Sequence, residues 1–456
     1  MDNALSLVGL GKLGLGLAAC YADCGIDVLG IDIEESVVNA VNDGKSPLME
    51  PGLDQLLAEY GGKTLRATMK HSEAIEHSDI TVILVATPSN PDGSFSNRHV
   101  EAALQSLATA LKESGKENHL FIISSTVMPG SIMGSFVPLI EKYSGRKLND
   151  GFDICFDPDF VALGHVVKGF KKPDLVIVGE SNPDAGARVA ALHDRMCENE
   201  PSVSRMSIES AELAKVCLNA YVCMKISFAN SVGNLCESIP GTNVDDITKA
   251  IGADKRISPH YFSAGLSFGG TCFPRDTKAY MTLGKKQGVQ TEIIESVERV
   301  NKHQDSRLSE MVLREVVKGE HRAVGVVGLA FAPGTPVVTE SPALKLIQEL
   351  QKSDLRTVAH DPNAIPATKA VLGSSVEYVN SVENCFDQTS LVVVTLRDAS
   401  FKEAIESVKP DKEVTVVDCW RILDTEKLDS NIRCIAPGRS SSESAEDSSA
   451  PMLLPV

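Results

Sequence analysis

The stretch "ALSLVGLGKLG", residues 4–14, joins an apolar strand to three glycines in the pattern G-x-G-x-x-G. A helical stretch follows, and "IDVLGIDI" at 26–33 has the composition of a second strand. In such a β-α-β unit the first glycine permits a tight turn, the second lets the backbone approach a pyrophosphate, and the third lets the helix pack closely. The pattern therefore predicts a dinucleotide site at Gly9, Gly11 and Gly14.

The acidic residue at the end of the second strand indicates which dinucleotide binds. Asp32 lies eighteen residues after Gly14, where a carboxylate accepts hydrogen bonds from a ribose diol. Glu34 and Glu35 add negative charge that would repel a 2'-phosphate, so the prediction is NAD and not NADP. The alternative, a glycine turn in some other α/β protein, does not require an acid at this place.

Apolar runs alternate with helical patterns over the first 200 residues. Helical patterns cover 98–113 and 183–197. Continuous apolar strands separated by helices indicate a parallel sheet covered on both faces, so we predict an α/β domain over 1–200. The further strand-like runs are "ITVILVAT" (80–87), "LFIISST" (120–126), "DICFDP" (153–158) and "DLVIVGE" (174–180).

A long helical stretch begins at Ser207 and has no glycine until Gly233, which predicts a central helical domain over 201–318. Such a helix suits dimerisation, and it equally suits a helix enclosed between two domains. A second α/β pattern begins at "RAVGVVGLAF", and we place that domain at 319–436. Its glycine turn lacks the third glycine, so it is expected to bind something else or only to pack. Residues 437–456 are rich in Ser and acids, which predicts a disordered tail.

Charge and hydropathy exclude several classes of function. The chain has 44 Lys and Arg against 61 Asp and Glu, a formal charge of -17, which argues against a nucleic-acid or anionic-membrane surface. The N-terminus lacks a basic region before its apolar run, and no segment has the roughly 18 uninterrupted apolar residues of a membrane span. The expectation is a soluble, cytoplasmic protein.

Eleven cysteines are scattered without a C-x-x-C pair or matching histidines, which argues against a metal site and against a disulfide framework. Most are expected to be small core residues. Cys272 stands apart, because "GGTCFPRD" at 269–276 places it behind two glycines. By residue type alone a buried structural thiol is the favoured interpretation, and a nucleophile is the alternative.

Several motifs in a fixed order carry a resemblance to a known family. They are "GLGKLG", "EPGL", "ATPSNPDG", "SSTVMPG", "DPDFVALG", "ELAKVCLNA", "DKRI", "FGGTCFPRD" and "GLAFAPGTPVVTESPAL". In this order the chain resembles the UDP-glucose/GDP-mannose dehydrogenase family from its N-terminus to about residue 430. The resemblance implies two Rossmann-like, doubly wound domains joined by a long central helix and a helical middle domain.

The resemblance also implies a reaction. The C6 alcohol of a nucleotide sugar is oxidised to a carboxylate while two NAD are reduced, and Cys272 holds the aldehyde first as a thiohemiacetal and then as a thioester. Lys215 and Asn219, four residues apart on one helical face, would stabilise the oxyanion. Without the resemblance, these two side chains fit a solvated helix surface better.

Further roles come from the resemblance alone. Asp276 and Thr126 would assist proton transfer or hold a water, and Asp159 would act as base in thioester hydrolysis. Many relatives have a glutamate where this chain has Asp159, so the carboxylate here is one methylene shorter. The expected cofactor contacts include Leu13, Thr87 and Thr126, and the expected substrate contacts are Arg256, Phe268, Gly269 and Arg421. In the family pattern the counterpart of Arg256 enters a neighbouring subunit, which implies a homodimer or a higher homo-oligomer.

Departures from the family pattern fall on substrate recognition. Ala332 and Thr339 replace a lysine and an arginine that meet the nucleotide phosphates in relatives, and Leu163 replaces an acid. Charge-assisted hydrogen bonds of this kind contribute about 1.5–3 kcal/mol each. The expected substrate is UDP-glucose, with a UDP-N-acetylhexosamine or GDP-mannose as alternatives.

Two other functions remain open on the sequence. A catalytically silent nucleotide-sugar or NAD binding protein would explain the loss of the two cations, although it would not need the thiol and its partners. A two-electron dehydrogenase of the β-hydroxyacid type would share the NAD domain and the long helix, but it needs neither Cys272 nor a third domain.

Overall fold

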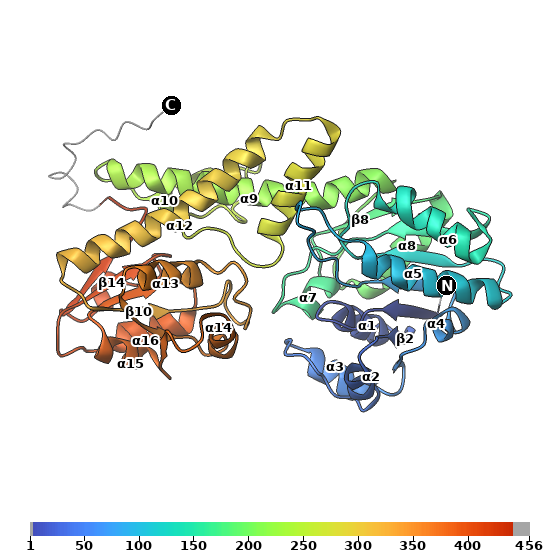
Figure 1. Cartoon of the computed structure of the whole chain (residues 1–456), viewed down its shortest axis with the longest axis horizontal. Helices are drawn as coiled ribbons and strands as arrows, with labels where there is room; N and C mark the ends of the chain where they lie inside the picture. Colours follow the sequence, from blue (N-terminus) through green and yellow to red (C-terminus); the bar gives the residue numbers. More distant parts are fainter. Residues whose placement is uncertain (1–2, 441–456) are drawn as a thin grey trace. The chain divides into compact units, whose positions relative to one another are not determined.

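A computed structural model describes residues 3–440 of the chain (Figure 1). The chain divides into two compact units, Met1–Cys217 and Leu218–Val456. Helix α9 (Ile208–Ser238) runs from the first unit into the second and closely matches the long helix predicted from the sequence. The predicted fold class, two parallel α/β sheets with a helical central domain, is confirmed.

The first unit is built on a nine-stranded sheet in the order β3-β2-β1-β4-β5-β7-β8-β9, with β6 beside β7. Strand β1 lies near the centre and pairs in parallel with β2 and β4, so the chain reverses its direction of winding beside β1. Ligands of such sheets bind at this switch point, beyond the carboxyl ends of the strands. The strands are β1 Ala4–Val8, β2 Asp27–Ile31, β3 Leu65–Thr68, β4 Ile80–Ile83, β5 Leu120–Ile123, β6 Lys147–Leu148, β7 Gly151–Phe156, β8 Leu175–Glu180 and β9 Ser202–Ser207.

The pleat of these strands explains their uninterrupted apolar composition. Leu5 and Leu7 of β1 pack into one hydrophobic cluster, whereas Val8 packs into the cluster on the other face. Both faces are covered by helices, so Leu5 to Val8 of β1 are all buried and only Ala4, at the start of the strand, is half-buried. The helices are α1 Gly14–Asp23, α2 Glu35–Asn42, α3 Leu53–Tyr60, α4 His71–His77, α5 Arg98–Glu113, the π-helix η1 Ile132–Phe136, α6 Val137–Ser144, α7 Val166–Lys171 and α8 Pro183–Met196.

The far edge of this sheet differs from the sequence prediction. Strand β8 runs antiparallel to β7, with Cys155 opposite Glu180, and β9 then pairs in parallel with β8. An antiparallel strand on an otherwise parallel sheet is a common arrangement. The sequence analysis did not predict β9, because its residues "SVSRMS" are polar and mostly exposed at the sheet edge.

The second unit begins with the helices of the central region and continues into a six-stranded parallel sheet in the order β12-β11-β10-β13-β14-β15. Figure 1 shows α13 and α16 on opposite sides of this sheet. The helices are α10 Val244–Gly252, α11 Phe273–Gln287, α12 Glu292–Lys318, α13 Pro342–Lys352, α14 Ile365–Leu372, α15 Val382–Gln388 and α16 Ala399–Ser407. The strands are β10 Ala323–Val327, β11 Arg356–His360, β12 Glu377–Tyr378, β13 Leu391–Val394, β14 Val414–Asp418 and β15 Ile432–Ile435, with a short 3-10 turn η2 at Thr425–Lys427.

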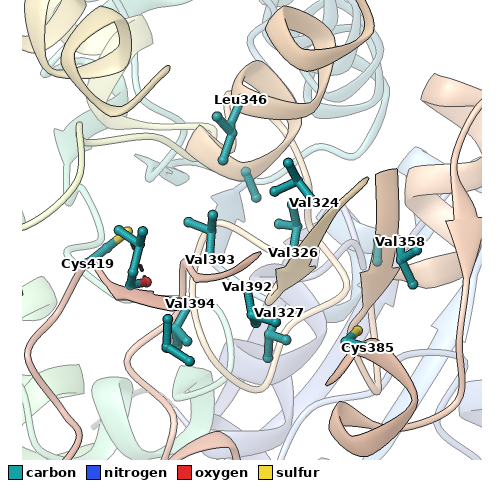
Figure 2. Packing of buried hydrophobic residues seen from close by; sticks show 14 of the residues in the cluster. Val324, Val326, Val327, Leu346, Val358, Cys385, Val392, Val393, Val394 and Cys419 are labelled. Carbon is teal, nitrogen blue, oxygen red and sulfur yellow. Dashed lines mark hydrogen bonds between the residues drawn. The ribbon is translucent and has the colours of Figure 1, made fainter. Parts of the chain in front are cut away.

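The core of the second sheet consists mainly of valines. Figure 2 shows Val324 and Val326 of β10 beside Leu346 of α13, while Cys385 of α15 lies on the opposite side of the strands. Full burial of a Val or Leu side chain contributes about 1.5–3 kcal/mol. Cys385 is buried here as a small apolar residue, as the sequence analysis expects of most cysteines.

Ordered contacts continue into the start of the predicted tail. The Gly438 N–H donates to Glu237 Oε1 at 3.0 Å, and the Gly241 N–H donates to Ser440 Oγ at 2.8 Å. The remainder of the predicted tail, 441–456, lies outside the described residues. Among the helices of the described part of the chain, none is both long and apolar enough to cross a membrane.

Candidate active site

The three glycines of the first turn have different surroundings. Gly9 has φ +99°, and a Cβ there would lie 2.4 Å from the Leu84 carbonyl oxygen. A Cβ on Gly14 would lie 1.9 Å from the Gly9 carbonyl oxygen. A Cβ on Gly11 would meet nothing within 4 Å. The outer two glycines are therefore required by the fold, and the middle one leaves an open surface that suits a close-lying pyrophosphate.

Asp32 connects the second strand to the glycine turn. Its Oδ2 accepts a hydrogen bond from the Leu10 N–H at 2.7 Å, and its Oδ1 accepts from the Glu34 N–H at 3.0 Å. The side chain is half-buried. Leu13 directly precedes α1, and no side chain caps that helix, so its N-terminus is suited to an anion. These residues fit an NAD pyrophosphate and ribose.

The C-terminal α/β domain contains a similar turn after β10, but its aspartate is buried. The Leu329 N–H donates to Asp361 Oδ2 at 2.8 Å, as the Leu10 N–H does to Asp32. However, Asp361 is buried, and its two oxygens also accept from the N–H groups of Ala330, Asn363 and Ala364. A carboxylate saturated in this way is poorly placed to bind a ribose, which agrees with the expectation that this turn binds something else or only packs.

The loops after β4 and β5 are joined beside the cofactor turn. Thr87 Oγ1 donates to the Thr126 carbonyl oxygen at 2.7 Å. Ser125 Oγ accepts from the Val85 N–H at 2.8 Å and donates to the Val85 carbonyl at 2.8 Å. These bonds bring Thr87 and Thr126 together at the carboxyl edge of the sheet, where the resemblance places both.

Glu212 on α9 fastens the continuation of the Thr126 loop, and the sequence analysis missed it. The buried carboxylate accepts from the N–H groups of Gly130 at 2.6 Å and Ile132 at 3.0 Å. Burial outweighs these two bonds and raises the pKa of Glu212 to about 7. An acid within the mainly apolar "AELAKV" was the available signal.

Lys215 lies one helical turn after Glu212 and is brought together with Asp159. Its Nζ donates to the Asp159 carbonyl oxygen and lies 4.5 Å from the centre of the Phe160 ring. The side chain is buried, so the interpretation as a solvated helix surface is wrong for Lys215. The Asp159 carboxylate is half-buried and accepts a long bond, 3.4 Å, from the Val161 N–H.

The loop that carries Asp159 is fixed at both ends. At its start Asp157 pairs with His193 Nε2 at 3.0 Å, and this charge outweighs the effect of burial and raises the pKa of His193 to about 10. At its end Glu50 accepts from the N–H groups of Gly164 at 3.0 Å and Val166 at 2.8 Å. Glu50 belongs to the "EPGL" motif, which thereby acquires a structural role.

Cys272 belongs to the second unit and directly precedes α11. All eleven cysteines lie in the described part of the chain, and among them only Cys272 is exposed. The positive end of the α11 helix dipole favours negative charge on a substrate oxygen bound next to this residue. Exposure and position both argue against a structural thiol.

Asp276 and Asn219 are also brought together in the second unit. Asn219 Nδ2 donates to Asp276 Oδ2 at 2.6 Å, and Arg275 Nε donates to Asp276 Oδ1 at 3.0 Å. Asp276 is fully buried, and its N–H donates to the Cys272 carbonyl at 2.8 Å. Asp276, one helical turn after Cys272, therefore orients the Asn219 amide.

The predicted substrate contacts have unequal surroundings. Phe268 is buried, and a Cβ on Gly269 would lie 2.2 Å from the Glu340 carbonyl oxygen. Arg256 is exposed, and its guanidinium pairs with the nearby Asp254 at 2.6 Å.

Arg421 is enclosed by protein oxygens. It pairs with Asp245 at 2.9 Å and donates to the carbonyls of Ala264 at 2.6 Å and Pro437 at 2.9 Å. A substrate contact of Arg421 stays a prediction, and it requires these bonds to rearrange.

The two positions that lack the family cations lie on the segment that faces the glycines of 269–270. The Gly270 N–H donates to the Thr339 carbonyl at 3.0 Å, and Ala332 follows Phe331, whose ring would meet a Cβ on Gly270 at 2.6 Å. Lys345 lies near this segment, but it pairs with Asp305 and Glu340, each at 3.0 Å.

Comparison with known proteins identifies the family. The chain is 33% identical over 421 residues to UDP-glucose 6-dehydrogenase AglM of Haloferax volcanii, covering 92% of this chain and 97% of that protein. The chain belongs to the UDP-glucose/GDP-mannose dehydrogenase family. Residues 3–197 match its NAD binding domain, 209–303 its central domain and 325–425 its UDP binding domain. It is therefore an enzyme of an NAD-dependent nucleotide-sugar dehydrogenase family.

Other relatives differ in substrate. The chain is 28% identical to GDP-mannose 6-dehydrogenase of Pseudomonas putida, covering 90% of this chain and 94% of that protein. The structure is similar to that of a UDP-glucose dehydrogenase from the archaeon Pyrobaculum islandicum, with a TM-score of 0.87, 30% identity and coverage of 97% and 98% of the two chains. At these identities the relatives support the reaction class, and they leave the sugar open.

Proposed function

We propose that this enzyme oxidises the C6 alcohol of UDP-glucose to the carboxylate of UDP-glucuronate, reducing two NAD. The observation that carries the proposal is the exposed Cys272 directly before α11, one helical turn before the buried Asp276, which pairs with the half-buried Asn219. A two-electron dehydrogenase has no use for this thiol. A silent binding protein has no use for an amide and a carboxylate arranged beside it.

Cys272 accounts for the second half of the oxidation. When bound, NAD supplies the hydride acceptor for both steps. The Cys272 thiolate adds to the carbon of the aldehyde and forms a thiohemiacetal, whose C–H bond then breaks as a hydride leaves, giving a thioester. Water adds to the thioester carbon, and the C–S bond breaks to release the acid and the thiol.

Lys215, Asn219 and Asp159 support this sequence in the proposal. The Lys215 ammonium and the Asn219 amide supply positive charge and a donor for the oxygen that becomes negative when sulfur or water adds. The half-buried Asp159 is suited to take the proton from the attacking water, because few contacts hold its carboxylate. Because the side chain of Asp159 is one methylene shorter than that of a glutamate, the attacking water must lie closer to the backbone of residue 159.

The substrate assignment rests on the UDP binding domain match and on relatives named for UDP-glucose. Ala332 and Thr339 are the observation that favours an alternative, because they remove cations from the expected phosphate site. The alternatives to UDP-glucose are therefore a UDP-N-acetylhexosamine and GDP-mannose.

A second copy of the chain is part of the proposal. Tyr221, Phe228, Leu235 and Ile239 are all exposed, with fractions from 49% to 60%, and the first three recur every seven residues along α9. Residues seven apart lie on one face of a helix, and an exposed apolar stripe of this kind marks an interface. We propose a homodimer formed through this stripe, in which Arg256 reaches the partner's sugar site.

The direct test measures reaction stoichiometry. Purified protein is incubated with NAD and, separately, UDP-glucose, a UDP-N-acetylhexosamine and GDP-mannose, and the NADH formed per sugar consumed is counted. We expect two NADH per UDP-glucose. One NADH per sugar would support the two-electron alternative, and no NADH with any sugar would support the silent binding protein.

A further inference from the structure

The segment before the Cys272 turn is a buried loop without regular secondary structure. Ala264, Leu266, Ser267 and Phe268 are all buried. Backbone N–H and C=O groups removed from water need hydrogen-bond partners, and a loop has no ladder or helix to supply them. In this protein two asparagine side chains supply those partners.

Asn301 of α12 pairs with both polar backbone groups of one residue. Its Oδ1 accepts from the Phe268 N–H at 2.7 Å, and its Nδ2 donates to the Phe268 carbonyl at 3.1 Å. The side chain is itself buried. Two bonds from one planar amide fix the orientation of the Phe268 backbone as well as its position.

Asn230 of α9 repeats this arrangement three residues earlier in the loop. Its Oδ1 accepts from the Gly265 N–H at 2.8 Å, and its Nδ2 donates to the Leu266 carbonyl at 3.2 Å. Asn230 is 1% exposed. The loop is thus held from two helices by side chains that imitate the bonds of a neighbouring strand.

The following glycines are confined from the other side. Gly270 has φ +82° and donates its N–H to the Thr339 carbonyl at 3.0 Å, and neither Gly269 nor Gly270 has room for a Cβ. The backbone is therefore confined from Gly265 to Gly270 and becomes exposed only at Thr271 and Cys272. The position of the thiol follows from the position of this loop.

We propose that Asn230 and Asn301 are positioning residues for Cys272, which hold the 265–270 loop so that the thiol is presented at a fixed place. The inference rests on the proposed nucleophilic role of Cys272. An amide is required at both sites, because an aspartate lacks the donor and an aliphatic side chain lacks both groups.

The experiment compares Asn301→Ala and Asn230→Ala with Ser231→Ala in the full-length protein. Ser231 is the control, because it follows Asn230 on α9 and its hydroxyl donates within that helix, to the Ser227 carbonyl at 2.9 Å. We expect kcat for NADH formation to fall about 100-fold in each test variant, the scale of a small misplacement of a reacting group. The KM for NAD should stay within twofold, since the cofactor turn belongs to the first unit.

Hydrogen exchange supplies a second readout. Amides of 265–271 should exchange faster in both test variants and at the wild-type rate in Ser231→Ala. Asn301→Asp keeps the acceptor for the Phe268 N–H, so it should retain more turnover than Asn301→Ala, and it serves as the test variant if the alanine protein does not fold.

Two results would overturn the inference: wild-type kcat in variants whose loop exchanges faster, or unchanged exchange in the loop. Failure of the proposed function has a different signature. In that case Cys272→Ser would itself form the acid at the wild-type rate, whatever the asparagine variants do.

Discussion

At the scale of single residues, the surroundings of Cys272 decide between its two interpretations. Composition favoured a structural thiol, because free cysteines are usually buried, and the ten others here are all buried or half-buried. Cys272 is exposed at the end of a confined loop. The glycines next to Cys272 can be read from the sequence. The exposure of its thiol follows only from how the loop packs.

Cys272→Ser is the residue-scale prediction. The serine hydroxyl can add to the aldehyde only to give a hemiacetal, and loss of a hydride to NAD would turn this into an ester that water cleaves far more slowly than a thioester. Acid formation should therefore fall at least about 100-fold while NAD binding is retained. The measurement is acid released over time, with intact-protein mass spectrometry for a trapped sugar ester. Cys217→Ser, at a half-buried site on α9, is the control and should keep its activity. Acid formation by Cys272→Ser at the control rate would remove the thiol from the mechanism.

The residues that the sequence analysis missed share one property. Glu212, Asn230 and Asn301 act on backbone groups that are 33 to 82 positions away in the chain. Motifs report residues that are close in sequence, so a side chain that satisfies a distant loop leaves almost no local pattern. Glycines and the acid after β2 were predictable because the turn they form is local.

At the scale of secondary-structure elements, apolar continuity identified most central strands and the long helix α9. Prediction failed at the edge of the first sheet, where β9 is polar and β8 reverses direction. An edge strand buries little, so its sequence is not constrained to be apolar, and strand direction depends on the connection and not on composition.

The contact between α9 and the loop of residues 130–132 gives an element-scale prediction. The pKa of Glu212 is raised from 4.5 to about 7, so the folded state binds a proton that the unfolded state has released at the pH values between. The contribution of Glu212 to the free energy of unfolding is therefore greatest below pH 4.5, falls as pH rises to about 7, and is constant above it. The total change is about 3 kcal/mol.

Glu212→Gln is the variant that tests this dependence. Urea unfolding followed from pH 4.5 to 8 should show that the difference in stability between wild type and Glu212→Gln shifts in favour of the variant as pH rises. Glu113→Gln, which alters an exposed carboxylate at the end of α5, is the control. A pH-independent difference between wild type and Glu212→Gln would contradict the raised pKa.

At the scale of the whole molecule, the apolar stripe on α9 predicts the oligomeric state. Phe228→Glu combined with Leu235→Glu places two charges on the stripe, and burying them in an interface would be costly. Sedimentation should show a dimer or larger species for the wild type and a monomer for the double variant. If Arg256 acts in the partner's site, the double variant should lose sugar oxidation together with dimerisation.

Val317→Glu on α12 is the control for surface charge, because Val317 is also a large exposed apolar residue, at 78%. This variant should sediment as the wild type does. A monomeric wild-type protein, or a double variant that remains dimeric, would show that the stripe on α9 is not the interface.

The two sheets of the molecule each contain a glycine turn after a central strand, at Gly9 and at Gly328. Both begin with a glycine in the left-handed region, and both are tied to an aspartate that ends the next strand. Only the first keeps an unobstructed surface and an aspartate with partial access to solvent. The second turn can therefore serve as a control for the first within the same molecule. A general disturbance of the backbone should change both turns, whereas binding of a dinucleotide should change only the turn at Gly9.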